Sequence, residues 1–173
     1  MNRRVFCLIF FFVFFGTVFN VYAAGSRETY VERRNFSIAI PETWEMVSVR
    51  ELRFNVLRGA FVDGFAPSIN FVDEIFEGDF DEYVRHVLEE IVSTFGENFE
   101  LILQTEFITY NDLRGELIVI TTYQQDRLIQ LNFFLFPGSD NRNMIITCTN
   151  LAIKHERYNE LFINTVRTFK WLR

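Results

Sequence analysis

The chain is poor in the residues that most often carry chemistry. Its 173 residues include only two cysteines and two histidines. Cys7 lies within an N-terminal apolar run, so Cys148 is the single cysteine of the remaining chain, which excludes an internal disulfide there. Neither His86 nor His155 stands at a metal-ligand spacing from the other histidine or from Cys148, which argues against a zinc site.

Motifs of enzymes and nucleotide-binding proteins are also missing. The eight glycines form no glycine-rich phosphate loop, and the segment GSDNRN, residues 138 to 143, is more simply a hairpin turn. The sequence contains no internal repeat and no low-complexity tract. We therefore expect a protein that is not an enzyme, with no catalytic, cofactor-binding or metal-binding residues and no cofactor.

The charge balance is acidic. Without Arg3 and Arg4, which belong to the N-terminal run, 15 basic residues stand against 23 acidic ones, a formal charge of −8. Nucleic acids and anionic membrane surfaces repel such a chain. Nucleic acid is therefore not expected as a partner, and membrane contact is expected only through the N-terminal segment.

Residues 1–23 have the pattern of a signal peptide. Two arginines precede an apolar run over residues 5 to 19. Val21 and Ala23 then occupy the −3 and −1 positions of a cleavage site before Ala24. An uncleaved anchor stays open, because the apolar stretch approaches the ~20 residues that span a bilayer. Either way we expect an exported chain, periplasmic or extracellular, or anchored to the inner membrane.

The rest of the chain fits one domain. About 150 residues remain, enough to bury a substantial core. We expect residues 24–32 to be a flexible leader and residues 33–173 to form a single domain. Fifteen of the 22 phenylalanines follow the N-terminal run, which indicates an aromatic-rich core.

Two segments have the apolar spacing of amphipathic helices. In residues 79 to 96 the apolar residues recur at steps of three and one. Asp79 with Glu82 resembles a capping box at the start, and Gly96 suits the C-terminal end. The second predicted helix runs from about His155 to Thr168, with the same spacing.

Other segments have the period of strands: residues 36 to 40 (FSIAI), 52 to 58, 68 to 75, 101 to 110, 113 to 123, 127 to 136 and 143 to 151. Short polar loops join the last four, as in antiparallel neighbours. The strand at 127 to 136 is apolar on both faces, with Phe133 on one and Phe134 on the other, so both faces need cover. We predict an α+β fold, a three-layer α/β/α sandwich with a mainly antiparallel sheet of about six strands.

The strand FSIAI is expected to lie in that sheet. Pro41 has no N–H to donate, so it is expected to end the strand and turn the chain. The large side chain of Trp44 is then expected to fill space at a sheet edge or a helix end.

The order of these segments resembles the PsbP-like superfamily. The resemblance covers residues 30 to 171 and is carried by FSIAIPETWE, DGFAPSINFV, DFDEYVRHVLEEI, YNDLRGELIVITTYQQDRLIQLNFF and the closing TFKW. This superfamily includes Ran-binding nuclear-import proteins and bacterial exported proteins of the DcrB and LpqN type. The resemblance implies an α/β/α sandwich and an accessory or binding role, with partners that differ among the relatives. Together with the missing site chemistry, it leads us to expect a non-catalytic module that binds an envelope protein.

Two kinds of side chain are candidates for chemistry, and each has a simpler explanation. Cys148 alternates with Met144 and Ile146, which predicts a small buried side chain rather than a nucleophile. His86 lies on the polar side of the first helix and His155 near the start of the second. A solvated helix face explains His86 better than a role as a base.

The densest group of carboxylates surrounds the start of the first helix. Oxygen ligands of this kind attract a calcium ion, and they could also contact a basic partner. The spacing matches no known calcium loop, and helix capping and the helix dipole account for part of the group. Its members are Asp73, Glu74, Glu77, Asp79, Asp81 and Glu82.

A second function stays open. The aromatic chain could line a cleft between the sheet and a helix, which would make the protein a periplasmic small-molecule or lipid-binding carrier.

Overall fold

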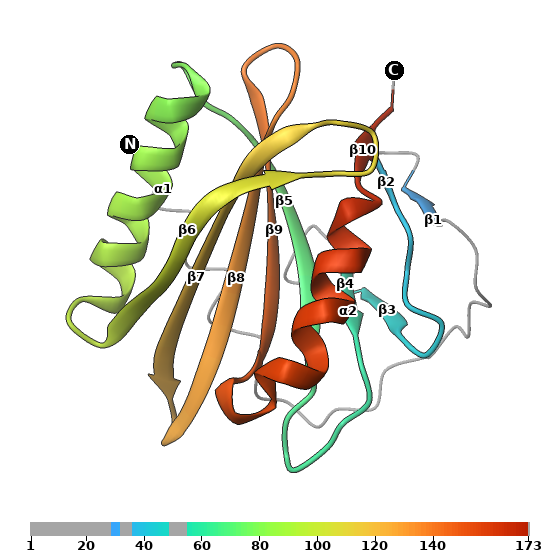
Figure 1. The fold of residues 1–173 in the computed structure, drawn as a ribbon, viewed down its shortest axis with the longest axis vertical. Helices are drawn as coiled ribbons and strands as arrows, with labels where there is room; N and C mark the ends of the chain where they lie inside the picture. Colours follow the sequence, from blue (N-terminus) through green and yellow to red (C-terminus); the bar gives the residue numbers. More distant parts are fainter. Residues whose placement is uncertain (1–28, 32–35, 49–54, 173) are drawn as a thin grey trace.

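The computed structural model describes residues 29–31, 36–48 and 55–172 (Figure 1). The predicted export signal lies outside these residues. Within them, no helix is long and apolar enough to cross a bilayer.

The described chain contains ten strands and two α-helices. In order they are β1 (Thr29–Val31), β2 (Phe36–Ile38), β3 (Glu45–Ser48), β4 (Asn55–Arg58), β5 (Ser68–Ile75), α1 (Phe80–Phe95), β6 (Phe99–Ile108), β7 (Arg114–Gln124), β8 (Arg127–Pro137), β9 (Arg142–Leu151), the 3-10 helix η3 (Ala152–Lys154), α2 (His155–Arg167) and β10 (Lys170–Trp171).

Seven strands form one antiparallel sheet in the order β3-β4-β5-β9-β8-β7-β6. Consecutive strands from β6 to β9 are joined by short turns, as their polar loops predict. In the turn between β7 and β8, Gln125 and Asp126 both have positive φ, which suits a two-residue hairpin. The mainly antiparallel sheet is confirmed, with seven strands in place of about six.

The helices cover opposite faces of this sheet (Figure 1). Alternation along β8 explains why both faces need cover. Phe133 and Leu135 pack in the core under α1, whereas Phe134 and Phe136 pack in the core under α2. The predicted three-layer α/β/α sandwich is therefore confirmed.

Helix α1 begins and ends where its sequence predicts. The Asp79 carboxylate accepts a hydrogen bond from the Glu82 backbone N–H at 2.8 Å, and the Glu82 carboxylate accepts one from the Asp79 N–H at 3.2 Å. These two bonds satisfy donors that the first turn leaves free. At the other end, Gly96 has a positive φ of 57° and donates to the Val92 carbonyl.

The strand at FSIAI lies in a different sheet from the one expected. β2 pairs with β1 and β10 in a separate three-stranded sheet. This strand packs against the core under α2 through Phe36, whose ring centroid lies 5.5 Å from that of Phe71 and 5.7 Å from that of Phe169. The expectation was wrong because β1 and β10, only three and two residues long, satisfy the hydrogen bonds of β2 away from the main sheet.

Pro41 and Trp44 behave as expected. β2 has ended before Pro41, and the Pro41 carbonyl accepts a hydrogen bond from the Trp44 N–H at 2.9 Å, which closes a turn. The buried Trp44 ring then meets Phe162 of α2 edge-on at 6.0 Å. It therefore packs beneath the helix, next to the start of the edge strand β3.

Three strands were not predicted. Thr29–Val31, within the expected leader, forms β1, Glu45–Ser48 forms β3, and Lys170–Trp171 forms β10. The proposed strand at 52 to 58 is described only from Asn55, where it forms β4, because residues 49 to 54 lie outside the described part.

Candidate protein-binding edge

Strand β6 forms one edge of the seven-stranded sheet. It is ten residues long, and among the described strands it pairs only with β7. An edge strand presents backbone N–H and C=O groups that an added strand can pair with. Proteins usually keep such edges short or strongly charged. The length of β6 therefore makes it a candidate binding surface.

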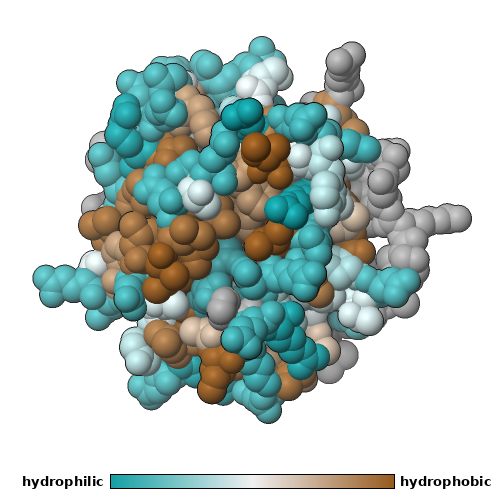
Figure 2. Space-filling view, in the orientation of Figure 1, coloured by the Kyte–Doolittle hydropathy of each residue, from teal (hydrophilic) through white to brown (hydrophobic). Residues whose placement is uncertain are grey.

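The middle of β6 is apolar and open to solvent. Leu101, Ile102 and Leu103 keep 49%, 51% and 44% of their surface exposed. Leu101 pairs with Ile120 and Leu103 with Val119, so Ile102 is the extra residue of a β-bulge. The bulge sends the two leucines to opposite faces of the sheet. Figure 2 shows a contiguous hydrophobic area over β6 and β7.

Both ends of β6 are anchored in the two cores. At its start, the Phe99 ring lies 6.2 Å from Phe95 at the end of α1. Near its end, Phe107 meets Phe134 edge-on at 4.7 Å under α2. The packed ends hold the exposed middle segment in a fixed position, which reduces the conformational entropy lost on binding.

Acidic residues surround this edge. Between residues 96 and 117 five acidic side chains, Glu97, Glu100, Glu106, Asp112 and Glu116, accompany a single basic one, Arg114. Arg114 contacts Glu106 at 2.9 Å. Both side chains of this ion pair are mostly exposed, so it contributes little to stability. The surface that remains combines apolar side chains with excess negative charge.

Cys148 lies in the core, as its alternation predicts. It is fully buried together with Met144 and Ile146 on the α2 side of the sheet. Burial raises the pKa of its thiol, because the thiolate would lose its hydration. In this position the thiol is closed off from solvent, where a substrate would approach.

The structure does not bring the acidic group at the start of α1 together as one site. Asp73 forms an ion pair with Arg142 at 3.3 Å, and Asp79 and Glu82 cap α1. Glu77 and Asp81 are exposed. Most of these carboxylates thus have a structural partner or face solvent.

Glu74 is also partly buried and has a structural partner. Its carboxylate accepts a hydrogen bond from the Tyr83 hydroxyl at 2.7 Å. Burial raises the pKa of Glu74, and the hydrogen bond and nearby His86 only partly offset this effect. Burial, with the charge of Glu74, also raises the pKa of Tyr83.

The two histidines belong to different helices. His86 is exposed, as predicted, and its ring stacks on Phe76 with centroids 5.3 Å apart. His155 is the first residue of α2.

The sequence predicted strand β6 but not its exposure. The available signal was the run LIL at residues 101 to 103, because three consecutive apolar residues break the alternation of a half-buried strand. Such a break is what a bulge produces. Periodicity alone does not identify the meander strand that lies at the edge.

No protein-family model and no curated protein matches the chain. Several solved structures do resemble it. Cyanobacterial PsbP (CyanoP) from Synechocystis aligns with a TM-score of 0.63 and 10% identity, covering 90% of this chain and 98% of that chain. LpqN of Mycobacterium tuberculosis, described as involved in cell envelope biogenesis, aligns at 0.62 with 7% identity over 80% and 83% of the two chains.

The Ran-binding protein Mog1p of Saccharomyces cerevisiae aligns with a TM-score of 0.56 and 10% identity, over 86% of this chain and 96% of that one. At such identities the likeness concerns the fold. The predicted resemblance to the PsbP-like superfamily is therefore confirmed in its architecture: this chain has the fold of PsbP, LpqN and Mog1p.

Proposed function

We propose that the chain is a non-catalytic, exported accessory module that binds an extended segment of an envelope protein along β6. The observation that carries this proposal is the exposed apolar middle of β6 at an open sheet edge. A segment that adds to this edge would gain backbone hydrogen bonds and would cover Leu101, Ile102 and Leu103.

Charge complementarity selects the partner segment. The acidic residues along β6 and its turns favour a strand that combines apolar and basic residues. The apolar side chains would cover the exposed leucines, and the basic ones would face Glu100 and Glu106. An acidic or uniformly polar strand would be repelled or would leave the apolar surface exposed.

Two further observations support the assignment. Mog1p, which has the same fold, is described as a Ran-binding protein, and LpqN as involved in cell envelope biogenesis. The N-terminal residues have the composition of an export signal, cleaved before Ala24 or retained as an anchor. The proposed location is therefore the periplasm or the extracellular side of the membrane.

Site-specific photocrosslinking in intact cells tests this function. A photoreactive amino acid replaces Ile102 in one variant, and Glu160, an exposed residue of α2, in a control variant. We expect discrete crosslinked products from position 102 and none from position 160. The additional substitutions Glu100→Lys and Glu106→Lys should abolish those products, because they reverse the charge of the edge. Identical product patterns at the two positions, or no product at position 102, would contradict the proposal.

The alternative function, a small-molecule or lipid carrier, needs a larger cavity than the pocket between the β4–β5 loop and the start of α2. Carrier pockets typically measure ~300–1,000 Å³. This pocket, at one end of the sheet, measures about 200 Å³ even when the open solvent at its mouth is included. Native mass spectrometry of freshly isolated protein separates the two functions, since a carrier would retain ligand mass in addition to the polypeptide mass.

A further inference from the structure

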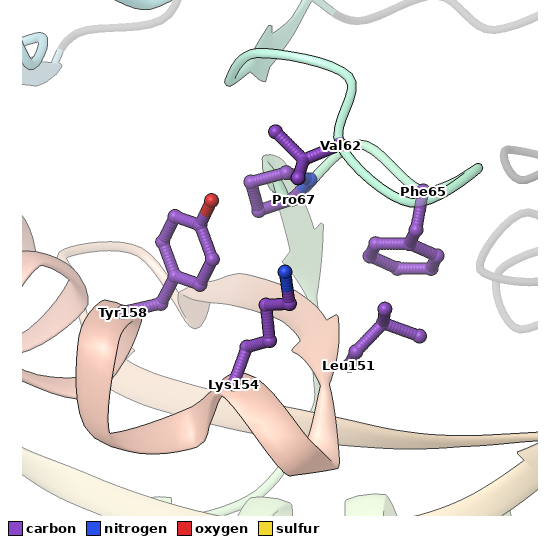
Figure 3. A pocket seen from close by; sticks show the side chains of 6 residues that line it. All are labelled: Val62, Phe65, Pro67, Leu151, Lys154 and Tyr158. Atoms are coloured by element: carbon purple, nitrogen blue, oxygen red, sulfur yellow. The ribbon is translucent and has the colours of Figure 1, made fainter.

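A small pocket lies where the loop between β4 and β5 meets the start of α2 (Figure 3). Most of its wall is apolar. Two polar groups also line it, the amino group of Lys154 and the hydroxyl of Tyr158. The complete lining is Val62, Phe65, Pro67, Leu151, Lys154 and Tyr158.

The Tyr158 hydroxyl is a polar group without a partner among the described residues, although only 9% of the residue is exposed. Figure 3 shows this hydroxyl and the Lys154 amino group pointing toward the same opening. The hydroxyl oxygen is not among the buried atoms that lack a partner, so it reaches solvent at the pocket mouth and can donate a hydrogen bond to a ligand there. It therefore marks a position for an acceptor atom next to a positive charge.

The Lys154 amino group already has a partner within the protein, and this partner lies at the surface. It forms an ion pair with Asp63 of the loop between β4 and β5. Contact with Lys154 lowers the pKa of Asp63, whose side chain is mostly exposed. Because water surrounds the Asp63 carboxylate, this pair is weak and can be exchanged for another carboxylate at small cost.

Three basic side chains, Lys154, Arg157 and Arg127, lie around this pocket, together with the acidic Asp63 of the loop and Glu156 of the first turn of α2. The Arg157 guanidinium lies over the Tyr158 ring, 5.4 Å from its centroid. Arg127 donates a hydrogen bond to the Gly64 carbonyl of the same loop. Helix α2 also begins beside the pocket, so the positive end of its dipole adds to the field. An anion is the ligand that this arrangement favours.

We propose that this pocket is a binding site for an aliphatic carboxylate, whose two oxygens bind the Lys154 amino group and the Tyr158 hydroxyl. Phe65, Leu151 and Pro67 then contact the aliphatic part. The base of the pocket has room for roughly one water molecule, so the carboxylate displaces water there and its alkyl chain lies in the open mouth. Asp63 competes for Lys154 and weakens binding.

The test is a titration of the full-length protein with sodium butyrate, followed by NMR chemical shifts at constant ionic strength. We expect saturable shifts at the pocket residues. The neutral ester methyl butyrate serves as the control for the charge of the ligand and should produce none. Equal binding of the acid and the ester, or no saturation by butyrate, would overturn the proposal.

Four variants assign the binding groups. Lys154→Met should weaken butyrate binding about tenfold or more, and Tyr158→Phe about threefold, as expected for charged and neutral hydrogen bonds. Asp63→Asn should tighten binding severalfold because it removes the competitor. Lys170→Met changes the other lysine of the chain, which lies on β10, and should have no effect. Tighter binding cannot result from unfolding, so failure of Asp63→Asn to tighten binding would also overturn the proposal.

A comparison of two peptides identifies the source of the carboxylate. A tetrapeptide ending in leucine with a free C-terminus is compared with the same peptide as its amide. Tighter binding of the acid than of butyrate indicates a polypeptide terminus as the ligand, whereas equal or weaker binding indicates a free short-chain acid. Equal binding of the acid and the amide would contradict carboxylate recognition.

Discussion

Asn70 of β5 and Thr147 of β9 are direct cross-strand partners, and a side-chain oxygen of each is buried without a hydrogen-bond partner. Both residues belong to the face that α1 covers. A buried polar atom without a partner has lost its hydration and gained nothing in exchange. This pair is therefore a local weakness in an otherwise apolar layer.

Replacement of Thr147 by valine should stabilise the fold. Valine has nearly the same shape but no hydroxyl, so the substitution removes an unpaired buried group, worth about 1 kcal/mol or more. Urea unfolding should show a higher midpoint with an unchanged slope. Thr149→Val on the same strand is the control, because the Thr149 hydroxyl is not among the buried unpaired atoms. A destabilised Thr147→Val protein would mean that water or another group satisfies the hydroxyl.

Glu74 should make stability depend on pH. Its folded pKa is raised by burial, so its contribution to stability is complete below the unfolded pKa, ~4.3. That contribution is lost as the pH rises through the folded pKa. Glu74→Gln stays neutral and still offers an oxygen to the Tyr83 hydroxyl. We therefore expect the variant to gain stability relative to wild type between pH 4 and pH 7.

Paired urea titrations at pH 4 and pH 7 measure this change. Other ionisable groups contribute equally to both proteins. The pH dependence of the difference in free energy of unfolding between the variant and wild type therefore reports on Glu74 and its neighbours Tyr83, His86 and Glu90. A difference that stays constant between the two pH values would show that burial does not raise this pKa.

Cys148 should resist thiol reagents in the native state. The side chain is fully buried and its pKa is raised, so the reactive thiolate forms only after the sheet opens. In a Cys7→Ser background, a chromogenic disulfide reagent should label Cys148 slowly in buffer and rapidly in guanidinium chloride. Rapid labelling in buffer would reopen the possibility of a nucleophilic role.

The sequence predicts which segments form helices and strands better than it predicts which of these segments pair with one another. Asp79 and Glu82 mark the start of α1 because capping depends on residues three positions apart. Phe133 and Phe134 reveal both covered faces because strand alternation is local. The sheet of β2 could not be predicted in the same way, since its partners β1 and β10 are very short and β10 lies far along the chain.

The candidate sites depend on such long-range neighbours. The exposure of Ile102 follows from the position of β6 at the end of the strand order, which local periodicity does not encode. Lys154 and Asp63 are separated by 91 positions and meet only because two loops share one end of the sheet. Their pairing leaves no pattern in a single sequence.

Substitution of Ile102 by lysine should leave the fold intact. The side chain is half exposed in a bulge, so the free energy of unfolding should change by no more than ~0.5 kcal/mol. The added charge should reduce edge-to-edge association and raise solubility, measured by static light scattering. Leu117→Lys is the matched control, because Leu117 is buried in the adjacent strand β7 and the fold should be lost. Comparable destabilisation by both substitutions would mean that β6 is covered.

Gly115 should tolerate no side chain, because β7 and β8 approach closely at this residue. A Cβ atom there would lie 2.1 Å from the Leu135 carbonyl oxygen and 2.5 Å from the Phe136 ring. The carbonyl belongs to a strand paired on both sides, so it cannot move without breaking ladder hydrogen bonds. Gly115→Ala should therefore cost about 1–3 kcal/mol, the usual cost of overpacking, seen as a lower urea midpoint.

The control for this substitution is Gly78→Ala. A Cβ at Gly78 would also meet close atoms, but these belong to the side chains of Glu82 and Phe76 at the exposed start of α1. Side chains can rotate away where a paired backbone carbonyl cannot, so Gly78→Ala should cost clearly less than Gly115→Ala. If the two variants lose the same stability, the obstacle at Gly115 is not the β8 backbone, and β7 must be free to shift along the sheet.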